Sequence, residues 1–198
     1  MMNTIIPHQD ARERVLAAAE QLFARRGYAA VTLRDIAAAV GIRHASLYHH
    51  APGGKEQLYI EVAERNFQRH RAGLTSAIQR AEPNVRAQLR AAAGWLLSQP
   101  PMDLVRLTHS DLPLIAPAEA ERLSRMAYDA MLSPIQQALE AARQRGEIAH
   151  PQPGLIAGGI LGMVESLHAV PDMAITESRT AMAHALLDAL LQGLYARS

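Results

Sequence analysis

The sequence predicts an all-α protein of about nine helices, with an N-terminal three-helix helix-turn-helix domain and a C-terminal helical domain. Apolar residues recur at spacings of three and four along nearly the whole chain, which is typical of amphipathic helices. No segment alternates apolar and polar residues as a half-buried strand would. Prolines and glycines interrupt the pattern at intervals that fit helix ends.

Length and composition narrow the class of protein. A chain of 198 residues with 49% hydrophobic residues can bury a sizeable core. The absence of cysteine excludes disulfides, thiolate nucleophiles and cysteine metal sites. The N-terminus lacks the apolar run of a secretory signal, and no uncharged apolar stretch is long enough to span a bilayer, so we expect a cytoplasmic protein. The net charge is +1, but residues 1–55 hold seven Lys/Arg against four Asp/Glu, a local excess of +3.

The first helix is predicted over about residues 10 to 26. Five apolar residues share one of its faces, and Gly27 offers a left-handed stop after the Arg25-Arg26 pair. The residues of this face are Val15, Leu16, Ala19, Leu22 and Phe23. We expect this helix to pack across the next two and complete a three-helix core.

Two short helices joined by a tight turn follow. Thr32 is a good N-cap and Asp35 stands three residues later, as in a capping box, so a helix should begin at Leu33. Gly41 can end it in the left-handed conformation. A second helix, about residues 44 to 50, keeps Leu47 inward. This arrangement is a helix-turn-helix, whose second helix can enter a DNA major groove.

The remaining chain reads as successive helices. A long connecting helix, residues 55–81, should run until Pro83, and its roughly 25 residues would span close to 40 Å. Pro134 should kink the helical segment that spans residues 118–145. The further segments are predicted at 85–97, 102–112, 155–170 and 177–195. Because residues 155–170 are apolar nearly all round, we expect them to be buried on every side.

The run from Val31 to Glu56 resembles the DNA-binding segment of the TetR family of bacterial transcriptional regulators. The residues that carry the resemblance are Thr32, Asp35, Ile36, Ala37, Gly41, Leu47, Tyr48, Pro52, Lys55 and Glu56. Arg43 stands where the family usually has a Ser or Thr cap, and Ala51 replaces the usual aromatic residue. Gly53-Gly54 includes one extra residue before Lys55.

This resemblance implies the organisation of the whole chain. Residues 1–54 would form the helix-turn-helix DNA-binding domain, joined to the start of the connecting helix at 55–81, and residues 55–198 would form the effector-binding and dimerisation domain. The last two helices, about 154–170 and 177–195, would pair with those of a second subunit. The partners would be a double-stranded DNA operator and a small-molecule effector, with no membrane partner and no cofactor. Most members of the family are repressors, so release from a palindromic operator by a small, mostly apolar effector is the expected mechanism.

Nine residues are candidates for contact with DNA. His44, Ala45 and Ser46 lie at the end of the second helix that would enter the groove, where they can meet base edges. The remaining candidates would contact phosphates, the roles of Tyr48, Lys55 and Thr32 being implied by the resemblance. These phosphate candidates are Thr32, Arg34, Arg43, Tyr48, His49 and Lys55.

Candidates for the effector site lie on the C-terminal helices, where methionine and aromatic side chains suit adaptable apolar pockets. They are Trp95, Met102, Met126, Tyr128, Met131, Met163, Glu165 and His168. Most of them can equally be ordinary core residues. Glu165 and His168, polar groups on an apolar helix, are better placed to orient a ligand, or alternatively to face a dimer partner.

Other functions are less well supported. The nine histidines lack short metal-ligand spacings, so no metal site is predicted. No phosphate loop, serine elbow or paired carboxylate motif is present, so we expect no enzyme. Two alternatives stay open: a helical carrier or enzyme that retains a non-functional helix-turn-helix, and a regulator that senses no ligand.

Overall fold

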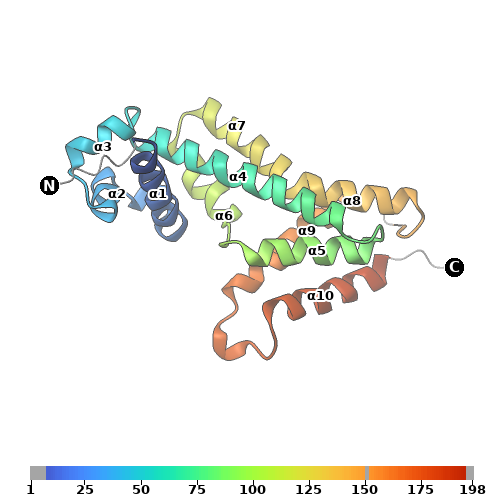
Figure 1. The fold of residues 1–198 in the computed structure, drawn as a ribbon. Coiled ribbons are helices and arrows are strands. Elements are labelled where there is room, and N and C mark those ends of the chain that lie inside the picture. The colour runs from blue at the N-terminus through green and yellow to red at the C-terminus, as the bar shows by residue number, and fades with distance from the viewer. Residues whose placement is uncertain (1–7, 150–151, 195–198) are drawn as a thin grey trace. The chain divides into compact units, whose positions relative to one another are not determined.

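A computed structural model of the chain describes residues 8–149 and 152–194. Helices dominate this part of the chain, and the predicted all-α class is confirmed (Figure 1). Ten α-helical segments are present in the described residues, one of them only three residues long, against the nine expected. None of these described helices combines the length and apolar character that a bilayer crossing requires. Contacts divide the chain into two compact units, residues 1–66 with 103–124, and residues 67–102 with 125–198.

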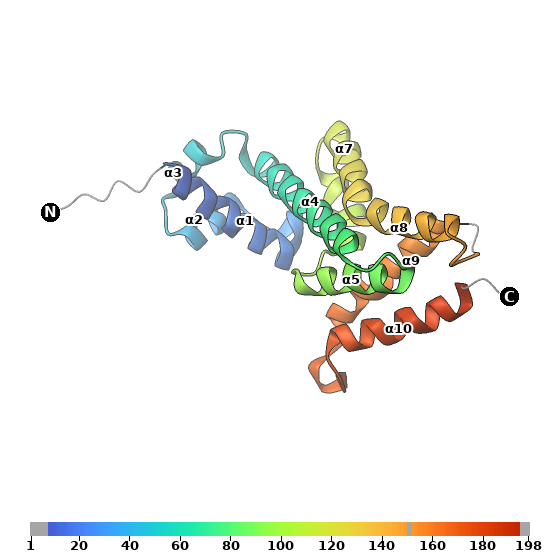
Figure 2. The same ribbon diagram turned by 45° about the vertical axis from the view of Figure 1, so that its right-hand side comes forward.

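The first unit contains the predicted three-helix core. Helix α1 spans His8–Ala30, α2 spans Leu33–Val40 and α3 spans His44–His50, close to the predicted bounds. Gly27 interrupts α1 at φ 74°, which confirms the predicted stop. The three helices lie together in both views (Figures 1 and 2). Their shared core is fully apolar and includes Val15, Leu16, Ala19, Phe23, Ile36, Val40 and Leu47.

The long helix and a later segment complete the first unit. Helix α4, Gly54–Arg80, begins in the first unit and continues into the second. Its bounds are close to those of the long helix predicted at residues 55–81. The segment from residue 103 to 124 contains α6 (Leu104–Arg106), the π-helical η1 (Leu107–Asp111) and the 3-10 turn η2 (Leu112–Leu114). Helix α7, Pro117–Ala127, follows. The π-helical turn was not predicted, because its one-residue shift in hydrogen bonding leaves no mark on the apolar spacing.

The second unit is a layered set of helices. Helix α5 spans Val85–Ser98, and α10, Arg179–Leu194, packs beside it (Figures 1 and 2). The π-helical η3, Tyr128–Leu132, leads into α8, Ser133–Gln144, so the helical pattern is interrupted at Pro134 as expected. Helix α9, Pro153–Ser166, packs on α8 and continues into the 3-10 turns η4 (Leu167–Ala169) and η5 (Asp172–Ala174).

The expected burial of residues 155–170 on every side does not hold within one chain. Ala157, Ile160 and Val164 face the core, whereas Leu155 is 66% exposed and all four glycines of α9 are exposed. Helix α10 has the same division: Ala183, Leu187 and Leu191 are buried, and Ala185, Leu186 and Ala189 are exposed. Each helix has more apolar surface than the core of a single chain can cover.

Candidate nucleic-acid interface

The start of α2 is fixed by a complete capping box. The Asp35 backbone N–H donates to Thr32 Oγ1 at 3.2 Å, and the Thr32 backbone N–H donates to Asp35 Oδ2 at 2.8 Å. The Thr32 hydroxyl itself donates to Asp35 Oδ2 at 2.7 Å, which holds the pKa of the Asp35 carboxyl below its ordinary value. At the other end, Gly41 adopts φ 76° and closes the helix, as predicted.

Helix α3 exposes most of one face and anchors the other through one residue. Leu47 is completely buried, while Ala45, Tyr48 and His49 are exposed and His44 and Ser46 are half-buried. The His44 and Tyr48 rings stand edge to face, 5.3 Å apart. Arg43 occupies the N-cap position and makes no side-chain capping bond. The first backbone N–H groups of α3 therefore have no capping side chain.

A shallow, open depression lies where α2 begins. It is lined by Ala29, Val31, Thr32, Leu33, Arg34, His44 and Lys55. Four of the nine residues predicted to contact DNA thus lie around one surface feature, although they come from α2, its cap, α3 and α4. The other five are on α3 or its N-cap. Ala29, Val31 and Leu33 line the depression without having been predicted.

Lys55 is the only lysine in the chain, and its amine is held in place. Its Nζ donates to the Tyr28 carbonyl oxygen at 3.0 Å and lies 4.0 Å from the centroid of the Tyr28 ring. An ammonium group over an aromatic ring is attracted to it electrostatically. Because an ammonium has three donors, the contact with Tyr28 leaves Lys55 able to bind a further acceptor.

The arginines near this surface differ in whether they donate hydrogen bonds to other groups of the protein. Arg34 and Arg43 are exposed, and no acceptor within residues 8–149 and 152–194 holds either of them. Arg14 donates to the Val40 carbonyl oxygen at 2.9 Å and so gives a hydrogen-bond partner to the last carbonyl of α2. Arg26 donates to the Ala30 carbonyl oxygen at 2.8 Å.

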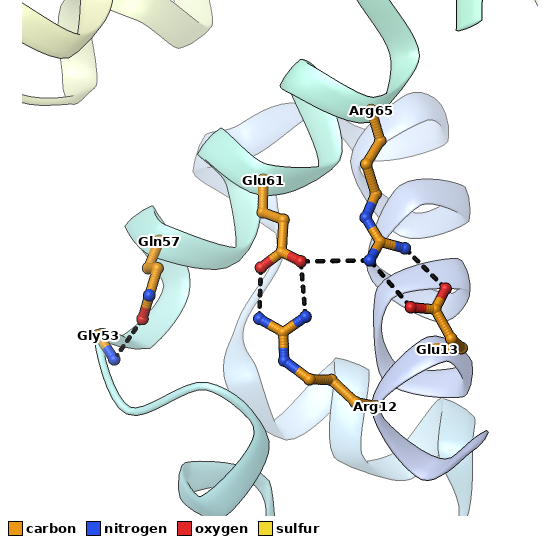
Figure 3. A network of polar contacts seen from close by, with 6 residues as sticks. All are labelled: Arg12, Glu13, Gly53, Gln57, Glu61 and Arg65. Atoms are coloured by element: carbon orange, nitrogen blue, oxygen red, sulfur yellow. Dashed lines mark hydrogen bonds and ion pairs between the residues drawn. The ribbon is translucent and has the colours of Figure 1, made fainter. Parts of the chain in front are cut away.

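An ion-pair network joins α1 to the first half of α4 (Figure 3). Arg12 donates to both oxygens of Glu61, at 2.6 and 2.5 Å. Arg65 donates to both oxygens of Glu13, at 2.7 and 2.9 Å, and also lies 3.4 Å from Glu61. The bond from Arg12 is the main reason that the pKa of Glu61 is lowered. The network holds the first half of α4, which carries Lys55 in its first turn, against α1.

The predicted effector residues are dispersed within the second unit. Met131 is completely buried, whereas Tyr128 is 48% exposed and donates its hydroxyl to Gln136 at 2.7 Å. Met126 and Met163 are half-buried. These four residues therefore range from core to surface.

Two of the predicted effector residues meet. The Met102 backbone N–H donates to Glu165 Oε2 at 3.2 Å. Burial raises the pKa of Glu165 to about 7, and the bond from Met102 opposes this shift only in part. His168 forms a hydrogen bond with the Leu96 backbone, and burial lowers its pKa. Both polar side chains therefore turn toward the α5 side of their own chain.

Among the described residues of the second unit, buried polar atoms without a hydrogen-bond partner occur at Trp95, His168 and His70. Trp95 lies so close over Gly73 that a Cβ at Gly73 would be 2.0 Å from Trp95 Cζ2. Trp95 Nε1 and His168 Nε2 are buried without a hydrogen-bond partner in the described residues. His70, one helical turn before Gly73, is only 2% exposed and its Nδ1 also lacks a partner there. No sequence pattern indicated the burial of His70, because it stands on α4 as one more polar residue.

Metal chemistry has no candidate site among the described residues, where no group of three or more His, Asp or Glu side chains could hold a metal ion.

The first unit presents a capped helix, a tight glycine turn and a second helix with an exposed polar face. Together they define the helix-turn-helix class of nucleic-acid-binding proteins.

Comparison with known proteins relates the helix-turn-helix region to one family. The sequence model of the family described as "Bacterial regulatory proteins, tetR family" matches residues 15–62. Residues 15–62 therefore carry the DNA-binding domain that is typical of the TetR family of transcriptional regulators.

Curated relatives share part of the sequence, and solved structures share the fold. The HTH-type transcriptional regulator LmrA of Bacillus subtilis (strain 168) is 50% identical over 53 residues, 27% of this chain and 28% of LmrA. The HTH-type transcriptional repressor NemR of Escherichia coli (strain K12) is 31% identical over 98 residues, 50% of this chain and 48% of NemR. The matches thus span about half or less of these relatives. The crystal structure of AibR in complex with isovaleryl coenzyme A and operator DNA shares the fold, with a TM-score of 0.72 at 22% identity over 93% of this chain and 98% of AibR.

Proposed function

We propose that this chain is a homodimeric transcriptional repressor that is released from a palindromic DNA operator by a small, mostly apolar effector. The observation that carries the proposal is the face of α3 that is exposed among the described residues, beside a depression lined by Thr32, Arg34, His44 and Lys55. Recognition helices dock in this way, with their outer face in a major groove. A location in the cytoplasm, where the protein would meet DNA, belongs to the same proposal.

Within this proposal each side chain has a role. His44 and Ser46 bond base edges, and Ala45 contacts a thymine methyl group. Arg34, Arg43 and the other cationic or hydroxyl groups bind phosphates, which fix the register of the protein on the duplex. These further phosphate ligands are Thr32, Tyr48, His49 and Lys55. The Thr32 hydroxyl is already engaged by Asp35, so its contribution is the orientation of the α2 N-terminus together with any phosphate contact.

Dimerisation through α9 and α10 is supported by their exposed apolar faces. Leu155 and the exposed glycines of α9, with Ala185 and Leu186 of α10, form surface that a second copy would cover. Small residues allow two helices to approach closely. A two-fold dimer would present two α3 helices to half-sites one helical turn apart, roughly 34 to 36 Å.

The effector is assigned to the second unit. Trp95, Met102, Met126, Met131 and Met163 supply apolar surface, and the polar groups of Glu165 and His168 would orient the ligand. Tyr128, being half exposed, would stand at the edge of such a site. AibR, whose structure holds both isovaleryl coenzyme A and operator DNA, supports the pairing of the two ligands on this fold. NemR, which is named a repressor, supports repression over activation.

The test is selection of bound duplexes from a random DNA pool, followed by a salt titration on the selected site. We expect a two-fold symmetric site and a steep fall of affinity with salt, because phosphate contacts release counterions. The variant Tyr48→Phe with Lys55→Ala should weaken this binding, whereas Tyr128→Phe, a matched change in the second unit, should not. No enrichment over random DNA would favour the carrier alternative.

The effector part is tested separately by a thermal-shift screen of small apolar compounds. A ligand at 100 times its dissociation constant should stabilise the folded protein by about 2.7 kcal/mol. The same compound should release the selected operator. If operator binding is found and no compound shifts the melting temperature, the alternative of a regulator without a ligand is preferred.

A further inference from the structure

One buried carboxylate lies behind the proposed DNA surface. Asp111, at the end of η1, is 5% exposed. The Tyr28 backbone N–H donates to its Oδ1 at 2.9 Å, and the Tyr59 hydroxyl donates to its Oδ2 at 3.3 Å. Arg106 Nε lies 3.6 Å from Oδ2. Asp111 thus joins α1, α4 and the 103–124 segment, all within the first unit.

The end of α1 is completed by the same segment. Arg106 Nη2 donates to the carbonyl oxygens of Phe23 and Ala24, at 3.3 and 2.9 Å. These carbonyls belong to the last turn before Gly27, where helix acceptors are otherwise without partners. A Cβ at Gly27 would lie 3.2 Å from Arg106 Cδ and 3.3 Å from Asp111 Oδ1. The positive φ favours glycine there, and a Cβ would also crowd Arg106 and Asp111.

Tyr28 connects this buried cluster to Lys55. Its N–H is held by Asp111, while its carbonyl oxygen and ring hold the Lys55 ammonium. The Tyr28 ring also packs on Tyr59, with centroids 4.9 Å apart. Burial raises the pKa of Tyr59, and the neighbouring charge of Asp111 raises it further, so the hydroxyl stays a donor to the carboxylate. The position of the Tyr28 peptide therefore fixes where the amine of Lys55 lies.

We propose that Asp111 is a positioning residue for DNA binding, which holds Tyr28 and thereby sets Lys55 at the edge of the depression. This inference rests on the proposed function for the DNA contact itself. Asp111 touches no DNA in this scheme. It acts from a segment far along the chain, so any change that moves η1 displaces Lys55 as well.

A direct measurement uses the single lysine. Reductive methylation with ¹³C-formaldehyde keeps the charge and labels only Lys55 and the α-amino group, which serves as an internal reference. In the wild-type protein the dimethyl-lysine NMR signal should be displaced upfield by the Tyr28 ring, and Tyr28→Leu should return it to the position of a free lysine. Asp111→Ala should do the same, while Asp111→Asn, which retains an acceptor for the Tyr28 N–H, should largely keep the wild-type signal.

A second variant tests the proposal in case Asp111→Ala does not fold. Replacing Asp111 by Leu and Arg106 by Met exchanges a partly buried charge pair for apolar groups of similar size, and replacing a buried pair in this way is often neutral or stabilising. This double variant should fold, show the free-lysine signal and bind the selected operator about tenfold more weakly. Its salt slope should fall by about 2 per dimer, one phosphate contact for each subunit.

The last step is a double-mutant cycle. If Asp111 acts through Lys55, adding Lys55→Ala to the Asp111 variant should weaken operator binding no further than Lys55→Ala alone. An unchanged Lys55 signal in folded Asp111→Ala or in the folded double variant, or additive losses in the cycle, would overturn the proposal. If the wild-type protein binds no operator, the proposed function fails, yet the NMR comparison still decides whether Asp111 positions Lys55.

Discussion

At the scale of single residues, those that begin and end the helices do most to shape the proposed DNA surface. Thr32 and Asp35 exchange hydrogen bonds across the start of α2. Gly41 and Gly27 end their helices with positive φ angles that other residues adopt only at a cost. Each of these groups was recognisable in the sequence, because capping depends on neighbours within three or four positions.

A first prediction concerns Thr32. Thr32→Ala removes the acceptor for the Asp35 N–H, and we expect a loss of about 1 kcal/mol in the free energy of unfolding, measured by urea denaturation. Operator affinity should fall as well, because the start of α2 is no longer fixed. Thr32→Ser keeps the hydroxyl and should retain both properties; a loss of the same size in Thr32→Ser would contradict the role of the cap.

A second prediction concerns the carboxyl of Glu165. Its pKa is raised to about 7 in the folded protein, from 4.5, so the folded state holds a proton that the unfolded state has released between these pH values. Stability should therefore fall as pH rises from about 4.5 through 7. Glu165→Gln should abolish this loss and stabilise the protein at pH 8 by about 1 kcal/mol, after allowance for solvent screening.

The measurement is the melting temperature of both proteins between pH 6 and 8.5. Below pH 6.5, protonation of His70 in the unfolded state acts in the opposite direction, because burial lowers the His70 pKa to about 4. The difference between variant and wild type removes this second contribution. Parallel curves for the two proteins would show that Glu165 has an ordinary pKa.

At the scale of helices, α1 and α4 are held together by charge as well as by apolar packing. The pair of Arg12 and Glu61 is bidentate, with both side chains partly exposed. We expect a double-mutant cycle of Arg12→Ala and Glu61→Ala to give a coupling of about 0.5 kcal/mol that weakens at high salt. The pair of Arg143 and Glu140, which is also bidentate but lies within α8, is a control in the second unit. A coupling that does not change with salt would contradict an electrostatic origin.

Helix positions were largely predictable from the sequence, whereas the contacts between distant segments were not. The bounds of α2, α3 and α4 follow from caps, glycines and apolar spacing. Asp111, however, looked like one acidic residue in a short helix, because its partner Tyr28 is 83 positions away. The burial of His70 was hidden for the same reason, since the residues that cover it cannot be deduced from the pattern of α4 alone.

The candidate site shows the same limit. The sequence placed His44, Ser46 and Tyr48 on the outer face of α3, because Leu47 had to be buried. It did not indicate that the Lys55 amine would rest on Tyr28, or that Ala29 and Val31 would line the same depression. Local pattern defines which side of a helix faces out, but the surface itself is assembled from segments that only the fold brings together.

At the scale of the whole molecule, the exposed apolar faces of α9 and α10 should decide the oligomeric state. We expect the wild-type protein to sediment as a dimer of 2 × 21.6 kDa, or about 43 kDa. Leu186→Glu introduces a charge on the exposed face of α10 and should give a monomer with weakened operator binding. Met173→Glu, at a residue that is 95% exposed, should remain dimeric. A dimeric Leu186→Glu protein would place the interface elsewhere.

The completion of α1 by Arg106 and Asp111 has a consequence for the order of synthesis. The three-helix core leaves the ribosome well before the residues that close it, because 83 positions separate Tyr28 from Asp111. At 5 to 20 residues per second this delay is about 4 to 17 seconds. During that time the Tyr28 N–H and the last carbonyls of α1 have only water as partners. The nascent core thus acquires its final helix end only after the chain has been extended far beyond it.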